Sequence, residues 1–113
     1  DLTVGVNNQA SASNTVRGIT SSGTSPMTNT INYVTISSLG NAEDFGDSTQ
    51  ARYGLEGMAS PTRAVFAGGN TDPAKVDTVD YVTIAHTGNA VHFGDLVAAC
   101  EYPAVCSNGH GGL

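Results

Sequence analysis

The chain has 113 residues, of which only 12% are charged, and four basic residues leave a formal net charge of −6. Because a phosphate-binding surface needs clustered Lys and Arg, this balance argues against a nucleic-acid partner, and the short apolar runs argue against membrane insertion. The 14 glycines and the abundant Ser, Thr and Asn residues instead favour short strands joined by tight turns.

Strand signals recur along the chain, whereas helical periodicity is weak throughout. β-branched and aromatic residues dominate segments 31–36 and 79–84, and a Gly-Asn pair after each segment supplies the positive φ of a hairpin turn. In chain order, the expected strands cover residues 4–12, 31–36, 42–45, 51–59, 63–69, 79–84, 90–93 and 98–105.

An internal repeat is the strongest signal in the sequence. Residues 29–47 align with residues 77–95 without a gap, at an offset of 48 residues, and eleven of the nineteen positions are identical. Repeats of this period are supersecondary units that must stack on their neighbours to bury both faces. We therefore expect residues 1–28 to form the first two strands of a preceding unit, 29–76 a central repeat unit, and 77–113 a second, truncated unit.

Four short motifs follow one another, one in each of four consecutive expected strands. Arg52 lies near the start of one expected strand, Gly68-Gly69 closes the next, Tyr81 lies in the third and Phe93 in the fourth. This order resembles the blades of Kelch and galactose-oxidase β-propellers, in which a Trp usually stands at the place of Phe93. The resemblance implies an all-β fold of Kelch-like β-propeller blades, with two four-stranded antiparallel repeats plus one extra strand.

The blade interpretation assigns places to small and aromatic residues. Inner strands crowd near a propeller axis, which suits the small residues Gly54, Gly57, Ala98 and Ala99. The aromatic residues expected between adjacent blades are Tyr33, Phe45, Tyr81 and Phe93. Because propellers have four to eight blades, two blades cannot close a ring. We expect either that the chain is an excerpt of a longer polypeptide, which we favour, or that several copies form a ring together.

Short phrases of the sequence suggest a biological setting. DYVTI, GNA, FGDL and SNGHGGL resemble repeats in proteins of bacteriophages that infect marine cyanobacteria. This resemblance implies a non-enzymatic structural or fibre component at the virion surface or otherwise extracellular. Its partners would be proteins, through the virion or self-assembly, and a host-surface glycan is a further candidate. The alternative is a cellular carbohydrate- or protein-binding β-propeller.

The longest polar loop is the candidate ligand-binding segment, since loops on a rigid scaffold commonly carry binding residues. Its amides, carboxylates and hydroxyl groups suit sugar hydroxyls, and the alternative is a plain solvated connector. The candidate residues are Asn70, Thr71, Asp72, Lys75 and Asp77.

Other titratable groups do not form a recognisable active site. Carboxylates that flank the Phe-Gly pairs could bind calcium, but their recurrence in both copies favours a role in capping turns. These residues are Asp44, Asp47, Asp95 and, in place of Asp44 in the second copy, His92. Neither they nor His86 and His110 belong to a nucleophile motif. We therefore assign no catalytic residue, metal site or cofactor, and predict that the chain is not an enzyme.

Two further pairs of residues leave alternatives open. Arg52 and Arg63 could bind anions, although an inner-strand Arg more often bonds neighbouring backbone carbonyls. Cys100 and Cys106 are expected as free, partly buried thiols, with a local disulfide as the alternative.

Overall fold

The structure, a computed structural model, describes residues 1–108. Within this range the chain forms eight strands and no helix. The strands are β1 (Ala10–Ser13), β2 (Arg17–Gly23), β3 (Thr28–Thr35), β4 (Glu43–Asp47), β5 (Glu56–Ala59), β6 (Arg63–Ala67), β7 (Thr78–Thr83) and β8 (Val91–Asp95).

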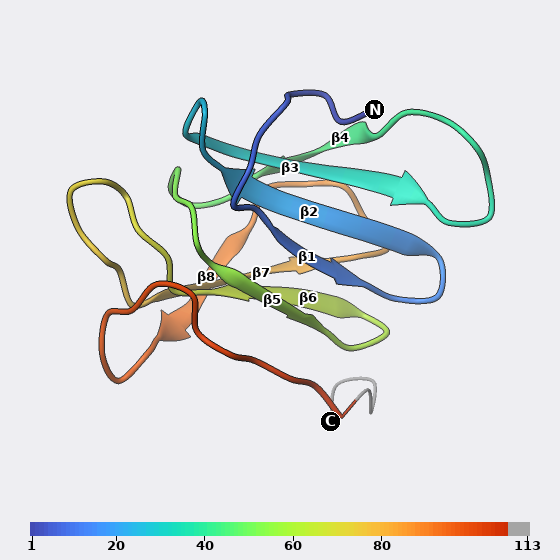
Figure 1. The fold of residues 1–113 in the computed structure, drawn as a ribbon. Helices are drawn as coiled ribbons and strands as arrows, with labels where there is room; N and C mark the ends of the chain where they lie inside the picture. The colour runs from blue at the N-terminus through green and yellow to red at the C-terminus, as the bar shows by residue number, and fades with distance from the viewer. Residues whose placement is uncertain (109–113) are drawn as a thin grey trace.

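The eight strands form two sheets with the same topology. The first sheet has the order β1-β2-β3-β4 and the second β5-β6-β7-β8, and every neighbouring pair is antiparallel. This confirms the predicted all-β fold with two four-stranded antiparallel sheets. Figure 1 shows the sheets lying against one another, with β1 next to β5.

The boundaries of the sequence repeat do not coincide with the boundaries of the sheets. The repeat unit 29–76 contributes β3 and β4 to the first sheet and β5 and β6 to the second. Arg17 pairs with Thr35 in the first sheet, and Arg63 pairs with Thr83 in the second. Counterparts are therefore 46 residues apart in the first two strands of each sheet and 48 apart in the last two. The span from Arg63 to Thr83 is thus two residues longer than its counterpart from Arg17 to Thr35.

The main core lies between the sheets. Ile19, Ile31 and Phe45 come from the first sheet. Ala64, Phe66 and Val82 come from the second sheet, and Ile84 directly follows β7. Each of these residues is at most 3% exposed. Fully burying a side chain such as Ile or Phe contributes about 1.5–3 kcal/mol, so this shared core holds the two sheets together.

β1 and β5 come close together at a glycine. A Cβ atom on Gly57 of β5 would overlap the backbone carbonyl of Ser11 in β1. Gly54 has a φ of 65° and lies under the ring of Tyr102. Larger residues at either glycine would push β1, β5 or the segment after β8 apart.

One expected strand is wrong and two are shorter than expected. Residues 96–108 form no strand, so the extra strand expected over 98–105 is absent, and Ala98 and Ala99 are exposed. Within the described residues the backbone of this segment makes isolated bonds, among them those of Cys100 with Gly69 and Val76 and that of Tyr102 with Gly54, but it has no partner strand with which to form a ladder. The strands expected over 4–12 and 51–59 are reduced to β1 and β5, with isolated bridges at Asn7 and Tyr53.

Candidate functional site

The contact between the sheets includes a set of backbone bonds that we call the inter-sheet joint, formed by residues 45–47 of β4 and residues 88–90 before β8. Gly88 N donates to Phe45 O at 2.8 Å, and Ala90 N donates to Asp47 O at 2.8 Å. The Asn89 side chain accepts from Asp47 N at 3.0 Å. The Gly-Asn pair expected to shape a hairpin turn therefore also binds the edge of the neighbouring sheet.

The same bonds recur at the other end of the first sheet. Ala42 N donates to Asp1 O at 2.7 Å, and the Asp1 ammonium donates to Asn41 Oδ1 at 2.7 Å. Asp1 thus occupies, on the first sheet, the place that Asp47 occupies on the second. Thr3 Oγ1 also bonds Asn32 Oδ1, which matches the bond from Thr49 to Asp80.

Three residues with left-handed backbone mark one position of the repeat. Asn8, Gly54 and Tyr102 have φ values of 55°, 65° and 53°. Gly54 N donates to Asn8 O at 3.0 Å, and Tyr102 N donates to Gly54 O at 2.6 Å. The three residues therefore occupy equivalent positions of the repeat, and each one after Asn8 donates a backbone hydrogen bond to the one before it.

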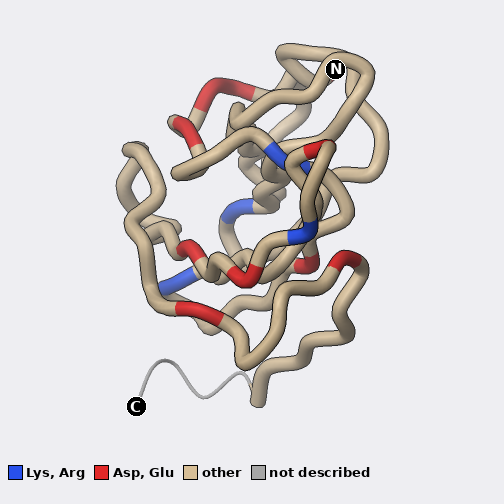
Figure 2. Tube along the Cα trace, turned by 90° about the vertical axis from the view of Figure 1, so that its left-hand side faces the viewer, with Lys and Arg blue, Asp and Glu red and all other residues tan. Residues whose placement is uncertain are grey.

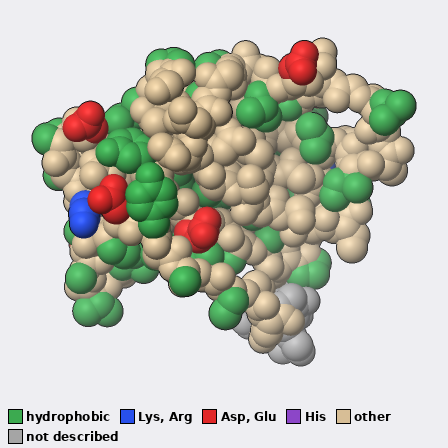
Figure 3. Space-filling view, in the orientation of Figure 1, with side chains coloured by type: hydrophobic (Ala, Val, Ile, Leu, Met, Phe, Trp, Pro, Cys, Tyr) green, Lys and Arg blue, Asp and Glu red, His purple; other side chains and the backbone are tan. Residues whose placement is uncertain are grey.

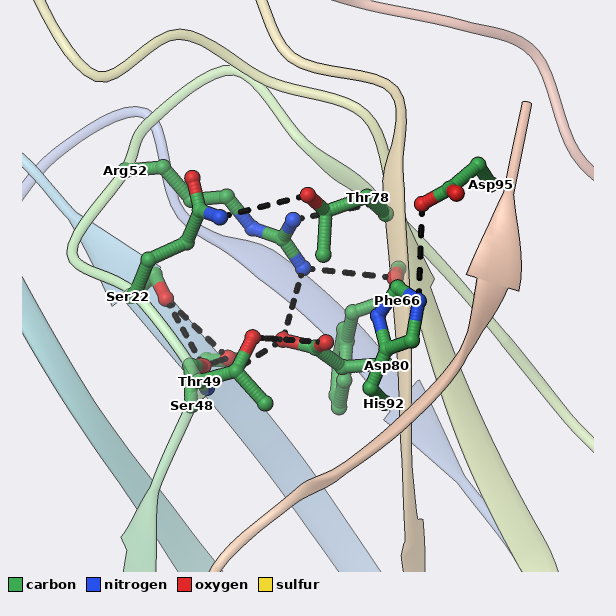
Figure 4. Close-up of polar contacts among 11 residues, drawn as sticks. Ser22, Ser48, Thr49, Arg52, Phe66, Thr78, Asp80, His92 and Asp95 are labelled. Carbon is green, nitrogen blue, oxygen red and sulfur yellow. Dashed lines mark hydrogen bonds and ion pairs between the residues drawn. The ribbon is translucent and has the colours of Figure 1, made fainter. Parts of the chain in front are cut away.

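A buried ion pair fixes the segment between β4 and β5 to the second sheet (Figure 4). Arg52 Nη2 lies 3.0 Å from Asp80 Oδ2, and both side chains are 0% exposed. Arg52 also donates to Thr78 O at 3.0 Å and to Phe66 O at 3.4 Å. Thr49 Oγ1 donates to the Asp80 carboxylate at 2.7 Å.

This network confirms the structural interpretation of Arg52 over an anion site. Burial lowers the pKa of the Arg52 guanidinium from its ordinary value, and the Asp80 charge opposes that effect. Sequence reasoning missed Asp80 and Thr49 as its partners. The available signal was a carboxylate at position 80, inside a strand where its repeat counterpart is the neutral Asn32.

The candidate ligand-binding loop folds back on itself and on the segment after β8. Asn70 Nδ2 donates to Glu101 Oε2 at 3.2 Å, and Lys75 Nζ lies 3.6 Å from Glu101 Oε1. Asp72 N donates to Asn70 Oδ1 at 2.6 Å, and Thr71 bonds Ala74 O through both its amide and its hydroxyl. Four of the five predicted residues thus lie in one hydrogen-bonded turn.

Asp77 lies apart from that turn. It directly precedes β7, and its carbonyl accepts from Leu96 N at 2.7 Å. Sequence reasoning also missed that residues 53 and 101 border the loop: the backbones of Tyr53 and Asn70 bond one another in both directions, at 3.0 and 2.8 Å. Burial, together with the negative charges of Asp72 and Glu101, raises the pKa of Tyr53.

This loop surface combines amides, carboxylates, an ammonium and a phenol. The Tyr53 phenol can donate as well as accept a hydrogen bond. Such a mixture suits a neutral polyhydroxy ligand. It offers no nucleophile activated by an adjacent base.

The remaining titratable groups give simple contacts. Asp44 Oδ1 accepts from Gly46 N at 3.1 Å, in line with a carboxylate that caps a turn. His92 Nε2 lies 3.5 Å from Asp95 Oδ1, with both side chains more than half exposed. Cys100 and Cys106 are free thiols, and His110 lies outside the described residues.

Within residues 1–108, no group of three His, Cys, Asp or Glu side chains is placed to hold a metal ion. No helix in this range is long and apolar enough to cross a membrane. Figure 2 shows acidic residues spread along the chain and basic residues scattered among them, without a basic stripe. In Figure 3 the visible face is mostly uncharged, with hydrophobic side chains at the surface on both sides.

Comparison with known proteins found no match, either to a family model or to a curated protein.

Proposed function

We propose that the chain is a non-enzymatic structural or fibre component of a virion, whose two sheets are blades of a Kelch-like β-propeller that serves as a binding and assembly module. The observation that carries this proposal is the repeated joint. Asp1 bonds Asn41 and Ala42 as Asp47 bonds Asn89 and Ala90, so both sheets bind the segment that precedes them in the same way. A module of this kind grows by adding equivalent sheets, as repeat architectures do.

Two further features support the propeller. β1 and β5, the first strands of the two sheets, lie next to each other, as the inner strands around a propeller axis do. The three left-handed residues Asn8, Gly54 and Tyr102 form a series of equivalent inner points.

The virion assignment is tested by locating the protein. Antibodies raised against the chain are used on marine phage lysates separated by density gradient, with immunogold labelling of the particles. A signal that co-sediments with labelled particles is the expected result. A signal confined to host cell fractions would overturn the virion assignment and favour the cellular propeller.

A second candidate function is carbohydrate binding by the loop surface. It is favoured by the Asn70 amide, which is bonded to the Glu101 carboxylate, and by Tyr53, whose backbone pairs with that of Asn70 and whose pKa the Glu101 charge helps to raise. A glycan array with the wild-type chain and Asn70→Ala tests it, with Thr62→Ala, in the exposed turn between β5 and β6, as a matched control. Binding that Asn70→Ala weakens and Thr62→Ala leaves unchanged supports this function, and binding that both variants retain excludes this loop.

A further inference from the structure

Within residues 1–108, each sheet has one face that no other sheet covers, which we call its uncovered face. On the second sheet, Cys106, Ser107 and Asn108 line a hollow of this face together with Phe93. The two uncovered faces are the repeat counterparts of the two faces already in contact.

Phe45 of the first sheet is 2% exposed, whereas its counterpart Phe93 in the second sheet is 59% exposed. Val82 of the second sheet is 3% exposed, whereas its counterpart Val34 in the first is 41% exposed. Within the described residues, each side of the existing interface is thus present a second time without a sheet lying against it.

The uncovered face of the first sheet carries a hollow of about 360 Å³. Its lining includes Ser11, Gly18, Thr20, Asn32, Val34 and Ala42. In the second sheet the counterparts of Gly18 and Val34 are Ala64 and Val82, which are buried in the same cluster as Phe45. The hollow therefore lies where an aromatic residue equivalent to Phe45 would pack.

We propose that the uncovered face of the second sheet binds the uncovered face of the first sheet of a second copy of this chain, with Phe93 entering the hollow. The inference deepens the proposed assembly function and rests on it. It extends an interface that already exists within the chain to the same two surfaces between chains. Head-to-tail contacts of this kind repeat from copy to copy and close into rings where the rotation allows.

The intramolecular joint specifies the bonds of this contact. By equivalence, Phe93 O accepts from Gly40 N of the second copy. Asp95 O accepts from the second copy's Ala42 N, and Asp95 N donates to its Asn41 Oδ1. These are the bonds that Phe45 and Asp47 make to residues 88–90 within one chain.

Arginine side chains extend the same equivalence. Arg17 Nη1 donates to Ile84 O at 2.7 Å across the existing interface. Its counterpart Arg63 already lies 4.7 Å from the centre of the Tyr81 ring, as Arg17 lies 4.6 Å from that of Tyr33. Arg63 is therefore held in the orientation from which it would reach the equivalent carbonyl of the second copy.

Two segments must move for the contact to form. Residues 103–108 are the equivalents of residues 9–14, which include β1, and Cys106, Ser107 and Asn108 line a hollow with Phe93. This segment must leave the second sheet so that β1 of the second copy can take its place.

Residues 1–8 and residues 95–102 are repeat equivalents, and Asp1 already occupies Asn41 and Ala42. Residues 95–102 of one copy therefore replace residues 1–8 of the copy they bind. This exchange costs the bond between Thr3 and Asn32. A variant that lacks this bond should consequently associate more tightly.

The contact is small, which sets the conditions of the test. Four strands about 4.8 Å apart and roughly 17 Å long give a face of about 300 Å². Stable interfaces bury about 800 Å² per partner, so a single contact should be weak and seen at concentrations of about 10 μM to 1 mM.

The test is sedimentation velocity on the full chain and on complementary variants. Wild type should form oligomers as its concentration rises. Phe93→Asp and Val34→Asp each remove one face at an exposed position, and each should lower the association constant by about tenfold or more. Ala74→Asp, at an exposed residue of the connection between β6 and β7, which takes no part in the proposed contact, is the control and should leave it within about twofold.

Mixing the two variants identifies the geometry. Phe93→Asp keeps the face of the first sheet and Val34→Asp keeps the face of the second, so an equimolar mixture should form a heterodimer and nothing larger. Thr3→Ala should raise the association constant severalfold. Circular dichroism verifies that every variant is folded.

Three results would overturn the proposal: a wild-type chain that is monomeric at about 1 mM, variants that associate like wild type, or a mixture that does not pair. Each would leave the virion assignment to the labelling experiment, which does not depend on association between isolated chains.

Discussion

The buried ion pair gives the sharpest stability prediction. In Asp80→Asn the Arg52 guanidinium stays buried, still bonded to the carbonyls of Thr78 and Phe66, but without a neutralising charge. Removing one partner of a buried pair costs about 3–5 kcal/mol. Because small domains are stable by only about 5–15 kcal/mol, the variant should lose a large part of its free energy of unfolding.

Urea unfolding followed by circular dichroism measures this loss. With an m value of about 2 kcal/mol/M, the midpoint should fall by about 1.5–2.5 M. Arg52→Met, which keeps the apolar stem, should also destabilise the protein, because it leaves the Asp80 carboxylate buried with only Thr49 as a donor. The double variant should be about 2 kcal/mol more stable than the sum of the two losses predicts.

In the first sheet, uncharged residues stand at the positions equivalent to this ion pair. The counterparts of Arg52 and Asp80 are Val6 and Asn32, and Asn32 bonds Thr3. A loss below about 1 kcal/mol for Asp80→Asn, or additive losses in the double variant, would refute the view that the pair acts as one buried unit.

Two more predictions concern the inter-sheet joint and a tyrosine. Gly46 has a φ of 148°, and a Cβ there would overlap the Gly88 carbonyl, so Gly46→Ala should lower the unfolding midpoint strongly. Its counterpart Gly94 has no atom within 4 Å of such a Cβ, so Gly94→Ala is the matched control, and equal effects would contradict the joint. The hydrogen bond from Tyr33 to Glu43, then burial and the Glu43 charge, raise the Tyr33 pKa above its ordinary value. Stability from this bond is therefore complete below the unfolded pKa of about 10 and lost as pH rises through the folded value. In a titration monitored at the phenolate absorbance, Glu43→Gln should shift Tyr33 to lower pH, and an unchanged curve would show that the carboxylate does not act on it.

The sequence predicted a strand correctly where the side-chain pattern favours a strand and a partner strand lies beside it. β3 and β7 lie within three residues of the expected β-branched segments 31–36 and 79–84, because their side chains and their pairing partners favour the same structure. The segment 98–105 was expected as a strand from its apolar residues and its place after the repeat, but it contains Pro103 and only one β-branched residue, Val105. It has no partner strand among the described residues and stays irregular. An apolar pattern alone therefore predicted a strand that neither residue propensity nor backbone pairing supports.

Part of the candidate site could likewise be predicted from the sequence, and part depends on the fold. Four loop residues could be predicted because a long polar connection is recognisable in the sequence: Asn70, Thr71, Asp72 and Lys75. Glu101, which bonds two of them, lies in a different repeat, and only the folded chain brings it to the loop.

The sequence by itself determined the duplication, the all-β class and the four-stranded antiparallel unit, since these follow from local alternation, turn residues and a fixed period. Tertiary structure alone decided which equivalent residues are buried. Phe45 and Phe93 belong to the same Phe-Gly-Asp motif, yet they are 2% and 59% exposed. The reason is that burial depends on whether a neighbouring sheet lies against a face, and a repeat motif carries the same pattern whether or not that neighbour is there.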